Sequence, residues 1–264
     1  MSETPPPNSL RRLRLRYAGV CVECGIQLSK GADTWYDDAR KKVVCLACGP
    51  TTVEPTTPGA SAQMEGERRR DKRVEDVRKR YGDHAAEVAK KVVGDEMAAT
   101  WGKGGDGETR LAAYVSRKVG DRVIPLHDRL IPGTRANIDH LWIAPSGVWI
   151  VDAKAHSGKV EKRRGELFVK GRTQQKLVNG MARQKEAVRA ALQLDPEMAD
   201  VDVFIALCFV EADWGLLDFP FSIGSVWVTY PGALVKSLKK SRGISREAME
   251  RIARLLATSL PPAA

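Results

Sequence analysis

The stretch Asn137-Ile-Asp-His-Leu-Trp-Ile-Ala-Pro-Ser-Gly-Val-Trp-Ile-Val-Asp-Ala-Lys154 contains two apolar runs separated by a Pro-Ser-Gly segment. Strand-forming residues on both sides of turn-forming residues predict a β-hairpin. If the turn is centred between Pro145 and Ser146, counting outward pairs Leu141 with Ile150. This register matters because a slip of one residue would move every side chain to the opposite face of the sheet.

Three charged residues of this hairpin are candidates for a catalytic centre. The same register places Asp139 opposite Asp152, which is destabilising unless a cation neutralises the two carboxylates. Asp152 and Lys154 share one face of their strand, and the carbonyl of Ala153 can complete an oxygen-rich site for Mg²⁺ or Mn²⁺. Each acid alone is more simply a solvated strand end. Together they favour phosphodiester hydrolysis, in which a metal stabilises phosphate charge and Lys154 orients the attacking water.

The segments around the hairpin predict an α/β fold with a mixed sheet flanked by helices. The glycine-rich residues 102–107 lead into a helix whose inward stripe holds Leu111, Ala112, Val115 and Val119. Other strands are predicted at 122–126, 201–210 and 225–229, and other helices at 177–194 and 245–259.

Two polar residues lie on inward helix stripes and are further candidates. Glu108 would add a carboxylate to the metal site if its helix packs on that face. Gln184 shares a stripe with Met181, so its amide points toward the sheet, although an amide that satisfies a strand end is an equally good interpretation. His140 and His156 flank the acids, but we exclude them, His140 because it alternates to the face opposite Asp139.

Four cysteines near the N-terminus predict a structural zinc site. Cys21-x2-Cys24 and Cys45-x2-Cys48 allow two tight turns to offer four thiolates to one tetrahedral Zn²⁺, as in a zinc ribbon. The alternative, two disulfides, is weak for a chain without a secretion signal. Gly25 and Gly49 follow the second cysteine of each pair, where a turn often needs positive φ. Cys208 lies in an apolar strand and is predicted to be an inert buried thiol.

The composition divides the chain into five segments. Residues 1–15 are predicted to be a disordered tail, 16–50 the four-cysteine zinc module, and 51–60 a linker rich in Thr, Pro and Gly. Residues 61–100 form a charged helical connector of one or two helices, and residues 101–260 form the main domain. In the connector, acidic residues offset many of the basic ones, so a solvated helix face is favoured over a phosphate-binding arm.

The net charge of +10 favours a polyanionic partner such as nucleic acid, although a basic balance also keeps proteins soluble. A basic stretch follows the hairpin closely enough to contact phosphates near a cut site: Lys159, Lys162, Arg163, Arg164, Lys170 and Arg172. No apolar run approaches the ~20 residues that a membrane-spanning helix needs. The N-terminus does not read as a secretory signal, so we expect a cytoplasmic protein.

These residues resemble the nuclease-related domain family, a branch of the PD-(D/E)XK restriction-endonuclease-like superfamily, over about residues 101–260, with actinobacterial members most similar. The resemblance is carried by Gly107-Glu108, His127-Asp128-Arg129, Ile131-Pro132-Gly133, Ala136-Asn-Ile-Asp-His140, Pro145-Ser-Gly-Val148, Val151-Asp-Ala-Lys154, Gly171-Arg172, Leu177-Val178 and Leu207-Cys-Phe-Val210. It implies a restriction-endonuclease-like core and a DNA-processing role. It also implies that Glu108, Asp139, Asp152 and Lys154 match the family's active-site motifs, and Gln184 resembles a helical Gln near active sites of related nucleases.

Two functions follow from the sequence. The first is an Mg²⁺- or Mn²⁺-dependent nuclease that acts on DNA, because the carboxylates and the lysine form a complete set. The second is a non-catalytic nucleic-acid-binding adaptor that uses the zinc module, the basic helices and the net charge. The intact set favours the enzyme.

Overall fold

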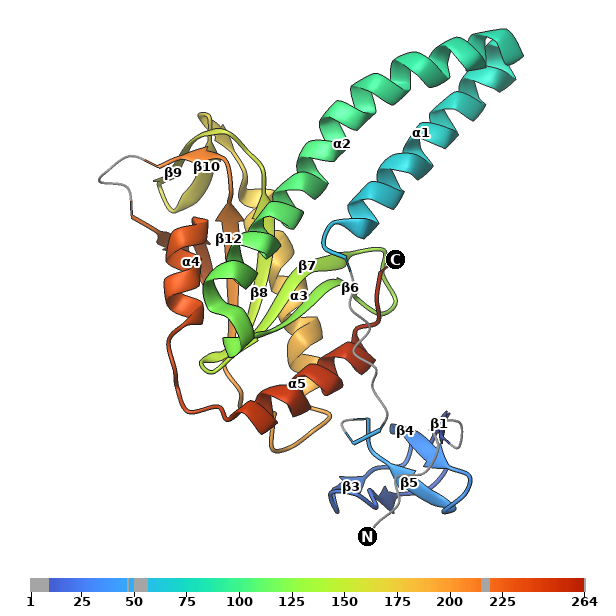
Figure 1. Cartoon of the computed structure of the whole chain (residues 1–264), viewed down its shortest axis with the longest axis vertical. Coiled ribbons are helices and arrows are strands. Elements are labelled where there is room, and N and C mark those ends of the chain that lie inside the picture. Colours follow the sequence, from blue (N-terminus) through green and yellow to red (C-terminus); the bar gives the residue numbers. More distant parts are fainter. Residues whose placement is uncertain (1–9, 47, 50–56, 215–218, 264) are drawn as a thin grey trace.

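A six-stranded mixed sheet forms the centre of the protein, as predicted (Figure 1). The computed structural model describes residues 10–46, 48–49, 57–214 and 219–263. The strand order is β14 (Phe221–Ile223), β15 (Val226–Thr229), β12 (Val203–Phe209), β8 (Gly147–Lys154), β7 (Asn137–Ala144) and β6 (Ile124–Leu130). The pairs of β12 with β8 and with β15 are parallel, whereas the other pairs are antiparallel.

The predicted hairpin is present in the predicted register. Leu141 pairs with Ile150, and the innermost pair is Ala144 with Gly147. Gly147 has φ 139°, and a Cβ there would lie 2.5 Å from the carbonyl oxygen of Asp202, so both conformation and space require glycine. The hairpin is therefore fixed by its turn as well as by its apolar strands.

Helices cover both faces of the sheet because its central strands are apolar on both sides. On one face, α2 (Asp83–Val119) and α4 (Pro231–Leu238) pack against side chains such as Trp142 and Val151. On the other face, α3 (Gln175–Leu192) and α5 (Arg246–Ser259) pack against side chains such as Leu141 and Ile150. Neighbouring residues of one strand thus enter different cores, as the period of two requires.

Two long helices extend from the sheet as an antiparallel hairpin (Figure 1). Helix α1 spans Ala60–Tyr81, and α2 follows it after Gly82 and leads into a 3-10 turn at Gly120–Arg122. The expected glycine-rich entry at 102–107 is wrong as a separate element, because α2 runs through it without a break. Glycine has a low helix propensity, so local sequence alone favoured a break at this segment.

A small sheet beyond the end of β8 was not predicted. It contains β9 (Gly158–Arg163), β10 (Glu166–Val169), β11 (Arg172–Thr173) and β13 (Ala212–Asp213). The sequence here indicated only a basic stretch. Its strands are short, and Gly165 (φ 85°) and Gly171 (φ 72°) supply the turns.

The N-terminal cysteine module, residues 10–49, consists of β1 (Leu10–Arg14), β2 (Gly19–Val20), β3 (Gln27–Leu28), β4 (Asp33–Asp37) and β5 (Lys42–Val44). Strand β1 pairs with β4, so the end of the predicted disordered tail is ordered. Most of the predicted linker 51–60 and residues 1–9 lie outside the described residues. Among the residues described, no helix has the length and apolar character to span a membrane.

Candidate functional site

The predicted acidic residues gather where β7 and β8 separate. The ladder between these strands ends at His140 and Val151, one pair before the two aspartates. Beyond it, the backbone N–H of Ala153 donates to Oδ2 of Asp139 at 3.2 Å. The carboxylate therefore takes the place of a ladder carbonyl, which turns Asp139 toward β8.

Asp152 and Lys154 form an ion pair on the same face of β8. Burial opposes the charged form of Lys154, but the carboxylates of Asp152 and Asp139 outweigh it and raise the lysine pKa above its usual range. The lysine is thus held as an ammonium at the centre of the acids. It supplies the positive charge that their proximity requires.

Glu108 reaches the same place from α2, because the helix passes very close to the end of β8. A Cβ on Gly107 would lie 2.9 Å from the Cβ of Ala155, so glycine permits this approach. Glu108 is buried, and its Oε2 has no hydrogen-bond partner. Burial raises its pKa to about 7, with contributions from Asp128 and Asp152 that Lys154 partly offsets.

The pKa of Asp139 is also raised well above its usual range, first by burial and then by the charge of Asp152. Lys154 acts in the opposite direction, and Glu108 adds to the rise. We call Glu108, Asp139, Asp152 and Lys154 the acidic site. Its carboxylates carry more negative charge than one ammonium neutralises, and a buried carboxylate oxygen lacks a partner, so the donor set fits a hard divalent cation.

Gln184 lies on the inner side of α3, and its Oε1 is buried without a hydrogen-bond partner. An amide that satisfied a strand end would have such a partner, so this observation goes against the structural interpretation. His140, which we excluded, bonds through Nδ1 to Nδ1 of His127 at 2.8 Å and stacks on Trp142. It belongs to the α2 face of the sheet.

Asp128 was missed as a candidate. It is 1% exposed, has a left-handed φ of 51°, and contributes to the raised pKa of Glu108. It falls between the paired residues His127–His140 and Arg129–Ile138, opposite Asp139, and its Oδ1 accepts a hydrogen bond from Nδ2 of Asn137 at 2.8 Å. Only the register of β6, which the sequence predicted to end at 126, could have revealed it.

The four cysteines of the module form a tight cluster. Their sulfur atoms all lie within 4.8 Å of one another, and Cys24 and Cys45 are 3.7 Å apart. Sulfurs around a tetrahedral zinc at about 2.3 Å are separated by about 3.8 Å, so this spacing fits the metal. The N–H of Cys45 donates to Sγ of Cys21 at 3.2 Å, and all described cysteines are free thiols.

The two glycines after the cysteine pairs serve different purposes. Gly25 has φ 73°, as predicted. Gly49 does not have positive φ, so that part of the prediction is wrong; instead, a Cβ there would lie 2.0 Å from Cδ1 of Trp35. Trp35 is partly buried and packs against the apolar core.

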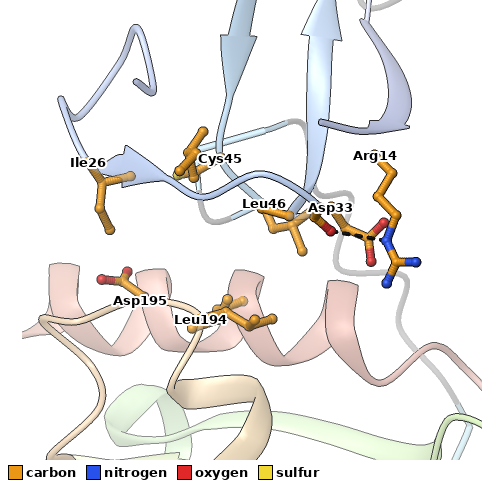
Figure 2. Close-up of a pocket in the computed structure, with 11 residues that line it drawn as sticks. Arg14, Ile26, Asp33, Cys45, Leu46, Leu194 and Asp195 are labelled. Carbon is orange, nitrogen blue, oxygen red and sulfur yellow. Dashed lines mark hydrogen bonds between the residues drawn. The ribbon is translucent and has the colours of Figure 1, made fainter. Parts of the chain in front are cut away.

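The module rests on α5 and on the loop after α3. Arg251 of α5 donates to both carboxylate oxygens of Asp195, at 2.7 and 2.9 Å. A cavity of about 190 Å³ separates the two parts, and Figure 2 shows Ile26 and Leu46 on its module side and Leu194 on the other. The contact is thus lined by apolar side chains from both parts, and the Arg251–Asp195 ion pair joins two elements on the main-domain side of it.

The acidic site is more open than the cysteine cluster. Among the residues described, the ligand atoms of the four cysteines all lie within 4.8 Å of one another. The carboxylate oxygens of Glu108, Asp139 and Asp152 do not all come that close together. Cys208, which the sequence assigned to the core, is fully buried in β12, and burial raises its pKa.

Residues 103–210 match the model of one protein family, NERD, described as the nuclease-related domain. The match confirms the family resemblance, covers the whole acidic site, and ends after β12. No curated protein and no solved structure matches the chain.

Proposed function

We propose that this chain is a metal-dependent nuclease that hydrolyses phosphodiester bonds in DNA. The observation that carries the proposal is the assembly of Glu108, Asp139, Asp152 and Lys154 from α2, β7 and β8 at one end of the sheet. This assembly lies within the segment that matches the nuclease-related domain.

Each residue of the acidic site has a distinct role in this proposal. Asp139, Asp152 and Glu108 would hold Mg²⁺ or Mn²⁺, which when bound supplies Lewis-acid stabilisation of phosphate charge and a lower pKa for the attacking water. Lys154, held as an ammonium, would orient that water and stabilise the charge that develops on the phosphate. Gln184 would use its unpartnered amide to position the water or a phosphate oxygen.

Basic side chains of the β9–β10 hairpin support a nucleic-acid substrate. Arg164 has a left-handed φ of 50° and Lys170 one of 51°, so both lie at turns beyond the end of β8. Both are exposed. Their position suits contacts with phosphates on either side of a cut site, which fix the substrate without reading its sequence.

The cysteine module would hold one structural Zn²⁺ through Cys21, Cys24, Cys45 and Cys48. Four thiolates close the coordination sphere, so this metal would stabilise the module without taking part in hydrolysis. Burial raises the pKa of Cys45 to about 12, and a bound cation would supply the charge that keeps it a thiolate. A reducing compartment such as the cytoplasm would keep these thiols available.

A cleavage assay tests the proposed activity. Purified protein is incubated with supercoiled plasmid, linear duplex, single-stranded DNA and RNA, with Mg²⁺ or Mn²⁺. Wild-type protein should cut DNA, and Asp152→Asn should lose at least ~10²-fold in rate, because the site loses both a ligand and the partner of Lys154. Asp213→Asn, at an exposed aspartate in β13, should cut as the wild type does.

Absence of cleavage on all four substrates, or equal cleavage by Asp152→Asn, would defeat the proposal. Loss of cleavage by Asp213→Asn as well would point to a general defect. Cleavage of RNA alone would keep the chemistry but overturn the substrate.

The second candidate, a non-catalytic nucleic-acid adaptor, is favoured by one observation. The carboxylates of the acidic site do not meet the close spacing of the cysteine cluster, and Lys154 already pairs with Asp152. An adaptor would bind nucleic acid in a salt-sensitive way that survives Asp139→Asn and Asp152→Asn. Metal-dependent turnover by the wild-type chain would exclude it.

A further inference from the structure

The hairpin of α1 and α2, which we call the helical arm, is rooted at the acidic site. Oγ1 of Thr109, the residue after Glu108, donates to the carbonyl of Pro58 at 3.2 Å, just before α1 begins. From there the arm projects away from the sheet (Figure 1). At ~1.5 Å per residue, the stretch of α2 between Asp83 and Glu108 measures about 38 Å.

Most of the charged side chains that the structure describes on α1 are segregated by sign. At ~100° per residue, five exposed basic residues fall within an arc of about 140°, and three acidic residues fall within a separate arc of about 80°. The basic face consists of Arg68, Lys72, Arg73, Lys79 and Arg80. The acidic residues are Glu67, Asp71 and Glu75. Asp76 is the one described acid within the basic arc.

Ion pairs involve both sides of α1, since Nζ of Lys79 on the basic face lies 4.0 Å from Oε1 of Glu75. Arg78, which lies among the acids, pairs with Glu75 at 2.9 Å and with Asp83 at 3.1 Å. Val74 is buried between the arcs, toward α2. Solubility alone requires interspersed charges, whereas a face on which the described basic side chains outnumber the described acidic ones five to one creates a field that attracts a polyanion.

We propose that the basic face of α1 binds the phosphate backbone of duplex DNA whose other end occupies the acidic site. This inference rests on the proposed function for the identity of the polymer. A duplex rises ~3.4 Å per base pair, so an arm of about 38 Å reaches phosphates about 11 base pairs from the scissile bond. A duplex keeps its direction over that distance, and the contacts are independent of sequence.

Binding measurements with a matched charge control test this inference. One variant replaces Lys72, Arg73, Lys79 and Arg80 with Gln. The control replaces four exposed lysines outside the arm's basic face with Gln, namely Lys118, Lys236, Lys239 and Lys240. Affinity for duplexes of 8 and 30 base pairs is measured over a range of salt concentrations without added divalent cation, and circular dichroism checks the folding of both variants.

The arm variant should bind the long duplex at least about tenfold more weakly, and its salt dependence should fall by roughly two to four in the slope of log K against log salt, since each lost phosphate contact contributes ~0.9. It should lose less affinity for the short duplex, because eight base pairs span ~27 Å and cover Lys72 and Arg73 but end before Lys79 and Arg80, which lie about 29–30 Å along α1 from Ala60. The control should change the long-duplex slope by less than one.

Three results would overturn the inference: an unchanged slope in the arm variant, an equal loss in the control, or an equal loss on both duplexes. These are distinguishable from failure of the proposed function. If the wild-type chain binds no DNA of either length, the nucleic-acid assignment itself fails; if it binds both and the arm variant matches it, only this inference fails.

Discussion

The cysteine module and the acidic site are both suited to a metal, yet they are built in opposite ways. The cysteines come from two short motifs, and their sulfurs already lie within 4.8 Å of one another. The carboxylates come from α2, β7 and β8, and the ammonium of Lys154 neutralises part of their negative charge. A site encoded by short local motifs is thus preformed for its metal. In a site assembled from distant segments, the carboxylates repel one another until a cation binds.

Removing a cysteine should produce the largest effect. Cys45→Ser should abolish zinc binding and unfold the module, because structural zinc contributes roughly 10–16 kcal/mol in small domains. Metal analysis and limited proteolysis of residues 10–49 measure this outcome. Cys208→Ala is the matched control and should keep one zinc per chain. A module that resists proteolysis without zinc would show that the metal does not stabilise it.

Acid should act on the main domain before it acts on the cysteine module, because the chain's four histidines all lie outside the module. Burial, together with the charge of Arg129, lowers the pKa of His127 to about 4, although Asp128 acts the other way. The folded state thus excludes a proton that the unfolded chain binds below pH 6.5. The contribution of neutral His127 to the free energy of unfolding is complete above pH 6.5. It is lost as the pH falls toward 4, by about 3 kcal/mol in total.

Urea unfolding at pH 7.5 and at about pH 5 measures this effect. His127→Gln should remove part of the pH-dependent loss in the free energy of unfolding, because burial also lowers the pKa of His140, and His84→Gln, at an exposed histidine of α2, should leave the loss unchanged. An identical loss in all three proteins would show that other groups control acid stability.

Removing a carboxylate should have the opposite sign to removing a cysteine. The raised pKa of Asp139 means that its ionised form costs stability at neutral pH, so Asp139→Asn should raise the free energy of unfolding without divalent cation by up to about 1 kcal/mol. Denaturant midpoints measure the change. If Asp139→Asn destabilises the metal-free protein, repulsion between the carboxylates of the acidic site does not lower its stability.

Among the substitutions that slow DNA cleavage, Gln184→Ala should have the smallest effect. Its amide positions atoms in our proposal and holds no metal, so Gln184→Ala should slow DNA cleavage by about tenfold and leave the metal requirement unchanged. Glu186→Gln, at an exposed residue of the same helix, should have no effect on the rate. A wild-type rate for Gln184→Ala would show that this residue takes no part in hydrolysis.

The hairpin and the cysteine cluster were predictable because both depend on local patterns. The alternation around residues 137–154 fixed the register of Leu141 and Ile150, and the two Cys-x2-Cys pairs indicated their own cluster. The sheet order and the mixed pairing agree with the predicted α/β class. In these regions a few neighbouring residues determine the outcome.

Other features depend on contacts between distant segments. The approach of Gly107 to Ala155 brings Glu108 to β8, and Asp128 joins the site only through its register with β7. The continuity of α2 through 102–107 and the β9–β10 hairpin likewise run against what local propensity favours. The sequence indicated the charges of these segments but not their positions.

The most direct test of the account is the rate of DNA cleavage by wild-type protein and Asp139→Asn at equal, measured zinc content, as Mn²⁺ is increased. We predict that the wild-type rate rises with Mn²⁺ and saturates, and that Asp139→Asn with full zinc remains at least ~10²-fold slower. Equal rates for the two proteins, or a rate that follows zinc content instead of Mn²⁺, would contradict the assignment of hydrolysis to the acidic site.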